Sequence, residues 1–197
     1  MPAYRKVLDL KGAAIGIAAP GVSAMLVARL VLARAGLSAQ DVRFVETAGV
    51  VAALQAIRSG QVDAMVHVEP VMTMLEQKGD VRIIGDTRSL KGASDIFGGM
   101  VPAGCLHASA DYVQNHPNTV QALTNAVVRA LKWLQTAGPS DLIKAVPDSY
   151  LLGDRALYLA SFGKVRESIA LDGVIAEDSV KNLIRIMGRL EPALQAD

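Results

Sequence analysis

Short apolar runs alternate with helix-forming runs from Asp9 to Pro70, and breaks containing glycine or proline separate them. The pattern predicts strands at 13–18, 42–46, 62–68 and 81–85, with helices at 23–35, 50–58 and 69–77 between them. Strands that alternate with helices of this length form right-handed β-α-β units. The sequence therefore predicts an α/β fold for residues 9–86, with a parallel sheet and helices on both faces.

The first strand and helix are bounded most clearly. Residues 13–18 form a continuous apolar run between Lys11-Gly12 and Pro20-Gly21, which is typical of a strand covered on both faces. Residues 23–35 are almost all helix formers, and Gly36 follows where a helix often ends. This strand is predicted to be central in the sheet, with a largely buried crossover helix after it.

Composition limits the partners. The chain has 197 residues, of which 51% are hydrophobic, and a net charge of +1 without blocks of like charge. It can bury a core, and nothing in its charge favours nucleic acid or an anionic membrane surface. Cys105 excludes an internal disulfide framework because it is the single cysteine, and it is expected to be a small buried hydrophobe. No apolar run approaches the roughly 20 residues of a membrane-spanning helix, and the N-terminus lacks the apolar segment of a signal peptide.

The second half is predicted to be mainly helical. Residues 98–108 read as an extended segment with Gly98-Gly99 at its start and the cap Ser109 after it. A short turn is expected at 111–115, and helices are expected at 119–135, 140–145, 154–166 and 177–190. The helix at 119–135 has an apolar stripe that needs a cover. Because other parts of the chain or a second copy must supply that cover, we expect self-association, with exchange of elements as one route.

The order of the breaks carries a family resemblance. Asp9-Leu10-Lys11-Gly12, Pro20-Gly21-Val22-Ser23, Ala35-Gly36-Leu37, Gly60-Gln61-Val62-Asp63-Ala64 and Val68-Glu69-Pro70 occur in the order typical of one lobe in certain extracytoplasmic solute-binding proteins. The chain resembles the nitrate, sulfonate, taurine and thiamine-precursor group of ABC-transporter binding proteins, the NMT1/SsuA-like family.

The resemblance implies a type II periplasmic-binding-protein-like fold. It implies an α/β ligand-binding lobe at 9–97, a hinge or crossover segment at 98–108, and a helical remainder of the other lobe at 109–197. In the family a first lobe precedes the segment that begins at Asp9. Only eight residues precede it here, so the N-terminal part of that first lobe is expected to be missing.

Three loops at the carboxyl ends of the strands are the candidate binding site, because ligands of open parallel sheets bind at that edge. Main-chain N–H groups at the helix starts are expected to point outward there and to hold an anionic group. The candidate residues are Pro20, Gly21, Val22 and Ser23 in the first loop, Thr47, Ala48, Gly49 and Val50 in the second, and Glu69 and Pro70 in the third.

Local alternatives stay open for each loop. Ser23 could only cap its own helix, and Gly49 could only serve a turn. Pro70 suits the first helical position and Glu69 the positive end of the helix, which is a complete structural explanation of the pair. Glu69 would otherwise disfavour a simple anion and pair with a cationic or zwitterionic part of the ligand.

The resemblance implies a solute-binding component of an ABC importer that captures a small anionic or zwitterionic organic ligand. Its partners would be that ligand and the permease subunits, its location periplasmic or extracytoplasmic, and no catalysis, cofactor or metal is expected. His67, His107 and His116 have no metal-ligand spacing. A thiamine-pyrimidine-synthesis-type enzyme would carry a cysteine-rich segment and active-site histidines. The effector-sensing domain of a regulator would need an upstream helix-turn-helix domain.

Overall fold

A parallel sheet forms the centre of the α/β part. The computed structural model describes residues 4–19 and 23–190, and within them the sheet consists of β1 (Ala14–Ile17), β2 (Arg43–Glu46) and β3 (Ala64–Val66) in the order β2-β1-β3. Ile15 of β1 lies opposite Phe44 on one side and Ala64 on the other. Every residue of β1 is buried, which confirms the predicted central strand.

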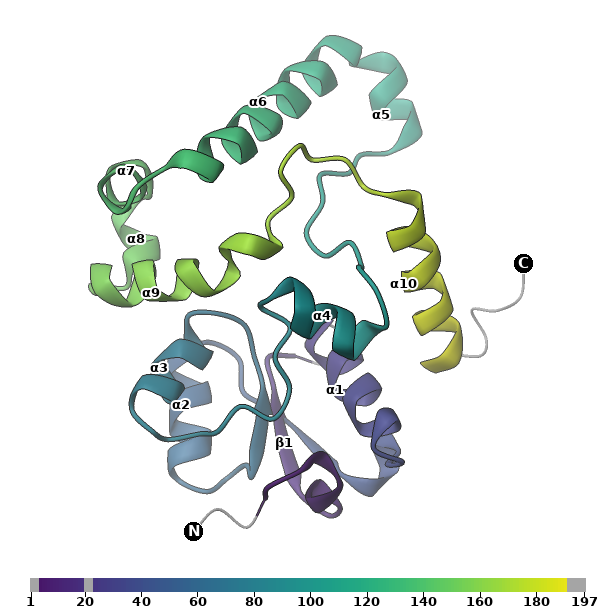
Figure 1. The fold of residues 1–197 in the computed structure, drawn as a ribbon, viewed down its shortest axis with the longest axis vertical. Helices are drawn as coiled ribbons and strands as arrows, with labels where there is room; N and C mark the ends of the chain where they lie inside the picture. The colour runs from purple at the N-terminus through teal and green to yellow at the C-terminus, as the bar shows by residue number, and fades with distance from the viewer. Residues whose placement is uncertain (1–3, 20–22, 191–197) are drawn as a thin grey trace.

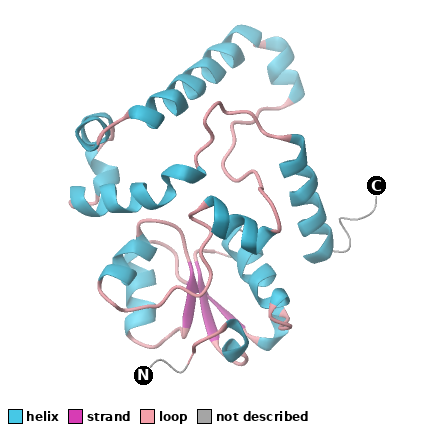
Figure 2. Ribbon diagram, viewed as in Figure 1, coloured by secondary structure: helices cyan, strands magenta, loops and turns pink. Residues whose placement is uncertain are grey.

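Helices cover both faces of this sheet (Figures 1 and 2). α1 (Ser23–Arg34) packs with α4 (Leu90–Phe97), whereas α2 (Val50–Arg58) packs with α3 (Val71–Gln77). The strand order requires the crossovers through α1 and α2 to run in opposite directions, and right-handed crossovers then place these helices on opposite faces. The α/β prediction for the first half is therefore confirmed.

The core divides along the same two faces. One cluster contains Leu10, Ala13, Ile15, Leu32 and Leu37, and the other contains Ala53, Val71 and Leu75. Burial of such aliphatic side chains contributes about 1.5–3 kcal/mol each relative to exposure. The sheet that carries the candidate loops therefore has an apolar cluster on each of its two faces.

Gly16 lies at the centre of β1 because the space beside it is filled. A Cβ on Gly16 would lie 3.2 Å from Cε of Met65 and 3.3 Å from Cγ2 of Thr47. Met65 belongs to β3 and Thr47 follows β2, so both neighbouring strands approach this glycine. The glycine thereby allows close packing at the strand ends that lead to the candidate loops.

The fourth predicted strand, 81–85, was wrong. Residues 81–89 contain no helix or strand, and α4 follows them, which the sequence analysis did not predict. Val81 packs against the α2–α3 cluster, and the guanidinium of Arg82 donates to the backbone oxygen of Tyr4. The apolar run at 81–85 is therefore anchored through side chains instead of a strand ladder, and a short apolar run alone does not distinguish the two.

The second half is helical, as predicted. It contains α5 (Ala110–Asn115), α6 (Pro117–Thr136), α7 (Pro139–Ala145), α8 (Asp148–Leu151), α9 (Arg155–Val165) and α10 (Glu177–Leu190). A 3-10 turn, Arg166–Ser168, follows α9, and the first half contains 3-10 turns at Val7–Leu10 and Ala39–Asp41. Ser109 caps α5 by accepting from the backbone N–H of Tyr112. α10 packs on α1, and Arg29 donates to the Leu190 oxygen at 2.7 Å.

α6 projects from the rest of the molecule (Figure 1). The structure describes all of α6, and none of its residues is buried. Leu123 is 47% exposed on the predicted apolar stripe, and Trp133 is 40% exposed. Cys105, in the segment before α5, is exposed, so the expectation of a buried cysteine was wrong. The exposure of α6 and that of Cys105 have the same cause, because little of the chain packs over α6 or over the extended segment before α5.

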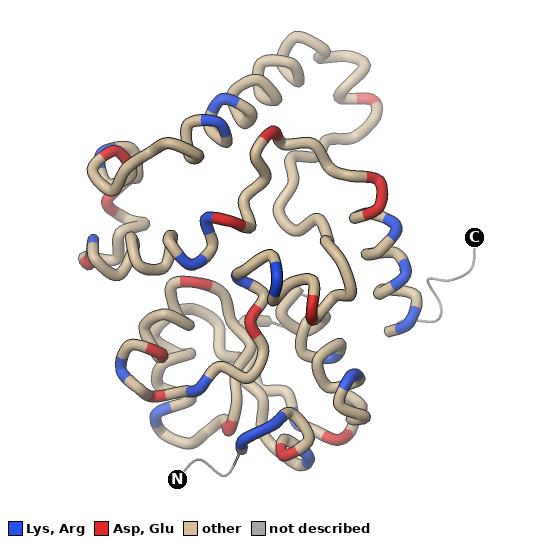
Figure 3. Tube along the Cα trace, viewed as in Figure 1, with Lys and Arg blue, Asp and Glu red and all other residues tan. Residues whose placement is uncertain are grey.

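Charged residues of both signs are interspersed along the chain (Figure 3). This distribution agrees with the small net charge. No helix among the described residues is long and apolar enough to cross a membrane.

Candidate functional site

The described parts of the candidate loops follow the carboxyl ends of the three strands. In a sheet of order β2-β1-β3, the helices that follow β1 and β3, α1 and α3, lie on opposite faces, which makes the β1–β3 edge a topological switch point. Pro20, Gly21 and Val22 lie outside the described residues. Ser23 begins α1 and is exposed.

Thr47 fixes the second loop from inside. Its side chain is buried, and its backbone N–H and hydroxyl both donate to the oxygen of Ile17, at 2.8 Å and 3.1 Å. These two bonds tie the end of β2 to the end of β1. Thr47 therefore positions the loop, whereas the residues after it are open.

The start of α2 is exposed. Gly49 is the N-cap with φ of 80°, a conformation that favours glycine, and its oxygen accepts from Ala53 N at 3.1 Å. Ala48 and Gly49 are exposed, and Val51 is 67% exposed. The N–H groups of the first turn of α2 have no intrahelical partner, so this end of the helix suits a negatively charged group.

The start of α3 is different, because the chain itself pairs one of its first-turn N–H groups. Glu69 Oε2 accepts from the backbone N–H of Thr73 in the first turn of α3, at 3.0 Å. Pro70 is the N-cap instead of the first helical residue. The chain's own carboxylate therefore occupies the positive end of α3.

Glu69 also belongs to a cluster of charges around Arg88. The guanidinium of Arg88 donates to Oε1 of Glu69 at 2.8 Å, to Oε2 of Glu76 at 3.2 Å and to Oδ2 of Asp86 at 2.6 Å. Lys164 of α9 pairs with Glu76 from the other side. This charge cluster, Glu69, Glu76, Asp86, Arg88 and Lys164, joins α3, the 81–89 segment and α9.

The pKa values of the cluster follow these contacts. The hydrogen bond from Lys164, followed by that from Arg88, lowers the pKa of Glu76. The side-chain bond from Arg88 lowers the pKa of Asp86, and Asp86 in turn raises that of Arg88. These contacts hold Glu76, Asp86 and Arg88 in their charged forms at neutral pH. The cluster contains three carboxylates and two basic side chains.

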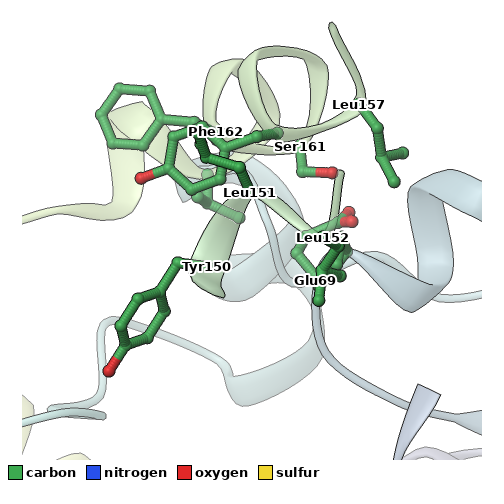
Figure 4. A pocket seen from close by; sticks show the side chains of 10 residues that line it. Glu69, Tyr150, Leu151, Leu152, Leu157, Ser161 and Phe162 are labelled. Atoms are coloured by element: carbon green, nitrogen blue, oxygen red, sulfur yellow. The ribbon is translucent and has the colours of Figure 1, made fainter. Parts of the chain in front are cut away.

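A pocket of about 230 Å³ lies between the start of α3 and the α8–α9 region (Figure 4). Its lining is mostly apolar and aromatic: Glu69, Pro70, Tyr150, Leu151, Leu152, Leu157, Tyr158, Ser161, Phe162 and Val165. Burial raises the pKa of the Tyr158 hydroxyl, so this tyrosine stays neutral. The α3 end of the pocket is the Glu69-Pro70 pair predicted from the sequence.

Ser161 is the polar exception on the α9 wall. It is 5% exposed, and its hydroxyl has no hydrogen-bond partner within the described part of the chain. In Figure 4 the oxygens of Ser161 and Glu69 point toward the same part of the pocket. A buried hydroxyl without a partner is unusual in proteins.

The sequence analysis missed the α8–α9 wall. Residues 157, 158, 161, 162 and 165 have the spacing of one helix face. Ser161 is a polar residue in the middle of that apolar stripe, and this was the available signal. The pocket unites part of one predicted loop with α8 and α9, and Ser23, Thr47 and Gly49 are not among its lining residues.

Metal binding has no support in the ranges 4–19 and 23–190. No group of three or more His, Cys, Asp or Glu side chains there could hold a metal ion. Binding at this edge would rest on backbone dipoles, the charge cluster and the apolar pocket.

Comparisons with known proteins agree with the fold. The model of the NMT1-like family matches residues 1–146. No curated protein matches the chain. A solved structure from Bordetella bronchiseptica RB50 is 48% identical, with a TM-score of 0.89, and the match covers 98% of this chain and 60% of that one.

Two further solved structures share the fold at lower identity. The alkanesulfonate-binding protein SsuA from Xanthomonas axonopodis pv. citri, bound to MOPS, is 22% identical with a TM-score of 0.68, and the match covers 98% of this chain and 61% of that one. The periplasmic aliphatic sulphonate binding protein SsuA from Escherichia coli is 17% identical with a TM-score of 0.57, with coverage of 98% and 58%. The chain therefore has the type II periplasmic-binding-protein fold and spans about three fifths of the length of these relatives.

Proposed function

The chain belongs to the NMT1-like family, and from this membership we propose that it is a solute-binding component of an ABC importer. The relatives from Xanthomonas axonopodis and Escherichia coli are named as sulfonate-binding proteins, and the first was solved with MOPS, which carries both a sulfonate and an amine. The ligand we propose is a small anionic or zwitterionic organic molecule of this kind. Binding, without catalysis, is the activity.

The observation that carries the proposal is the open start of α2 at the carboxyl edge of a 2-1-3 sheet. Gly49 with positive φ leaves the first-turn N–H groups accessible, and Thr47 holds the loop through two bonds to Ile17. An anionic group bound there gains from the helix dipole and from hydrogen bonds. We propose Ala48, Gly49 and Val50, with Pro20, Gly21, Val22 and Ser23 of the neighbouring loop, as its contacts.

The proposed domain organisation is that of a protein whose two lobes close around a ligand. We propose residues 9–97 as the ligand-binding lobe, 98–108 as the crossover segment and 109–197 as part of the other lobe. Closure of lobes around the ligand would be the state that permease subunits recognise. The protein would act in the periplasm or another extracytoplasmic space, and the Escherichia coli relative is named as a periplasmic protein.

We further propose that the chain self-associates through the exposed face of α5 and α6. Tyr112, Leu123, Val127 and Trp133 are each 40–47% exposed on these two helices. Leu123 and Val127 lie one turn apart on α6, and large contiguous apolar patches mark interaction sites. A second copy that covers this face would remove these side chains from water.

Ligand binding can be tested by thermal-shift and calorimetric titration of the purified chain with methanesulfonate, taurine, MOPS, nitrate and thiamine-pyrimidine precursors. Sodium chloride at matched ionic strength controls for screening of surface charges. A ligand present at 100 times its dissociation constant stabilises the folded state by about 2.7 kcal/mol. A folded chain that no compound stabilises beyond the salt control would contradict the proposed function.

A further inference from the structure

We propose that the pocket between Glu69 and Ser161 is a second binding subsite. It takes a small apolar group with an uncharged or positively charged arm, such as an aromatic ring that carries a short hydroxyl or ammonium arm. This inference deepens the proposed function, on which it rests, by assigning a chemical class to part of the ligand. It separates this pocket from the open start of α2, which suits an anion.

The size and lining of the pocket set the apolar part of the ligand. Tyr158 and Phe162 line it from α9, and Leu151 lines it from α8. An apolar cavity of about 150 Å³ accommodates benzene, so 230 Å³ holds a ring with a short arm. Drug-sized ligands need about 300 Å³ or more, which limits the occupant to a small molecule or to one end of a larger one.

Ser161 sets the polar part. Its hydroxyl is buried and unpartnered within the described chain, and a hydroxyl can both donate and accept a hydrogen bond. A ligand arm that carries an O–H or N–H group would satisfy it. The free protein therefore has an unmet hydrogen bond that this class of ligand can complete.

The charges around the pocket select against anions. The side chain of Glu69 is 12% exposed at the pocket wall, and both of its oxygens already accept hydrogen bonds. Behind it, the charge cluster holds one more carboxylate than cations. Arg166 lies 5.7 Å from the centroid of the Phe162 ring, but its guanidinium donates to the backbone oxygens of Leu134 and Ala137, and Glu69 is the charged residue in the lining. A carboxylate or sulfonate in the pocket would meet the carboxylate of Glu69 on its wall, whereas an ammonium group would be attracted to it.

Leu152 adds a specific geometry at the rim. Its φ of 50° is left-handed, which is uncommon for a residue with a side chain. It ends α8 and lines the pocket, next to the 69% exposed Tyr150. The turn between α8 and α9 thus forms a defined edge around the opening.

The experiment compares three probes that share one ring. Benzylamine, benzyl alcohol and benzoate differ mainly in the charge of the arm, and calorimetry or ligand-observed NMR at constant ionic strength measures their dissociation constants. We expect benzylamine and benzyl alcohol to bind at least about tenfold more tightly than benzoate, a difference of 1.4 kcal/mol. Benzoate binding as tightly as the other two would overturn the proposal.

Two variants locate the site. S161A should weaken binding of benzyl alcohol roughly 2- to 10-fold, and the melting temperature of the free protein should stay the same or rise, because an unpartnered buried hydroxyl is removed. S161L should fill the pocket and abolish binding of benzyl alcohol and benzylamine. S94A, at an exposed serine of α4, is the matched control and should bind as the wild type does.

The outcomes separate this inference from the proposed function. Binding of anions in the proposed panel, with no binding of benzylamine or benzyl alcohol, would overturn the subsite and leave the solute-binding function standing. The subsite would also be overturned if S161A and S161L bound the benzyl probes with the affinity of the wild type. Binding of the benzyl probes that responds to Ser161, with no response to any anion or zwitterion, would support the subsite and contradict the proposed ligand class. No binding of any compound would overturn both.

Discussion

Replacing Arg88 by methionine is predicted to be among the most destabilising single changes in the charge cluster. The guanidinium bridges Glu69, Glu76 and Asp86, and its side chain is only 14% exposed. Methionine keeps much of the apolar volume and removes the positive charge. Three carboxylates would then lie close together with Lys164 as their remaining cation.

The magnitude follows from the exposure of each partner. Breaking a buried ion pair by removing one partner costs about 3–5 kcal/mol, and the Arg88–Glu69 pair, 14% and 12% exposed, is of this kind. Asp86 and Glu76 are 40% and 37% exposed, so each of these contacts adds about 0.2–1 kcal/mol. Glu69 keeps its bond from Thr73 N, which offsets part of the loss. We expect R88M to lose about 3 kcal/mol, or roughly 6–12 °C in melting temperature for a chain of this length.

The pH dependence gives a second readout. The pKa values of Asp86 and Glu76 are lowered in the folded state, so their contribution to stability is complete above the unfolded-state pKa values and is lost as pH falls through the folded-state values. The wild type should therefore lose stability progressively below about pH 5. In R88M the pKa of Asp86 is no longer lowered by Arg88, and the stability loss below that pH should be shallower.

Urea unfolding followed by circular dichroism, at neutral pH and in steps down to about pH 3, measures both effects. The matched control is R58M, because Arg58 contacts Oδ2 of Asp80 at 2.7 Å with the two side chains 47% and 26% exposed. R58M should lose less than about 1 kcal/mol. An R88M variant as stable as R58M, with the pH dependence of the wild type, would refute the reasoning.

Three other predictions concern different parts of the molecule. V51E, at the start of α2, should have a melting temperature equal to or above that of V51Q, because a carboxylate suits this helix end. V51E should bind an anionic ligand about tenfold more weakly than V51Q, because the two negative charges repel each other. Equal affinity of the two variants in titration would mean that the anion site lies elsewhere. G16A should cost about 1–3 kcal/mol in urea unfolding, since its Cβ would lie 3.2 Å from Met65, and an unchanged midpoint would show that the strand ends can separate without cost. If the chain self-associates through α6, light scattering should show an oligomer that the double variant L123E/V127E converts to a monomer, whereas a monomeric wild type at tens of micromolar would rule out that contact.

The parts of the fold that local sequence determines were predictable. Gly36 ends α1 with positive φ, as predicted for a helix cap, and Gly49 comes directly before α2. The apolar run at 13–18 is the central strand β1, observed at Ala14–Ile17. The structure of residues 81–85 was not predicted correctly, because strand formation there depends on whether the edge of a neighbouring strand is available. In the structure, side-chain contacts hold this segment in place of the hydrogen bonds of a sheet. Local sequence patterns therefore predict well where helices and strands end, but predict poorly which strands pair.

The candidate site divides in the same way. The open start of α2 is a local feature that Gly49 and the residues after it specify. The pocket depends on α9 packing against α3, which brings Ser161 to the same cavity as Glu69. No local pattern encodes that contact, although a serine within an apolar helix face was a visible irregularity.

Glu69 connects stability and binding in this molecule. One of its oxygens caps α3 through Thr73 N, the other pairs with Arg88, and the side chain still lines the pocket. Lys164 and Ser161 both lie on α9, so the helix that closes the pocket is held to α3 by the same charge cluster that sets the pocket's potential. Loss of Arg88 should therefore weaken benzyl alcohol binding even at temperatures where R88M is fully folded, because α9 and Glu69 lose a shared anchor. R58M, whose ion pair lies outside the cluster, should lose none of that affinity.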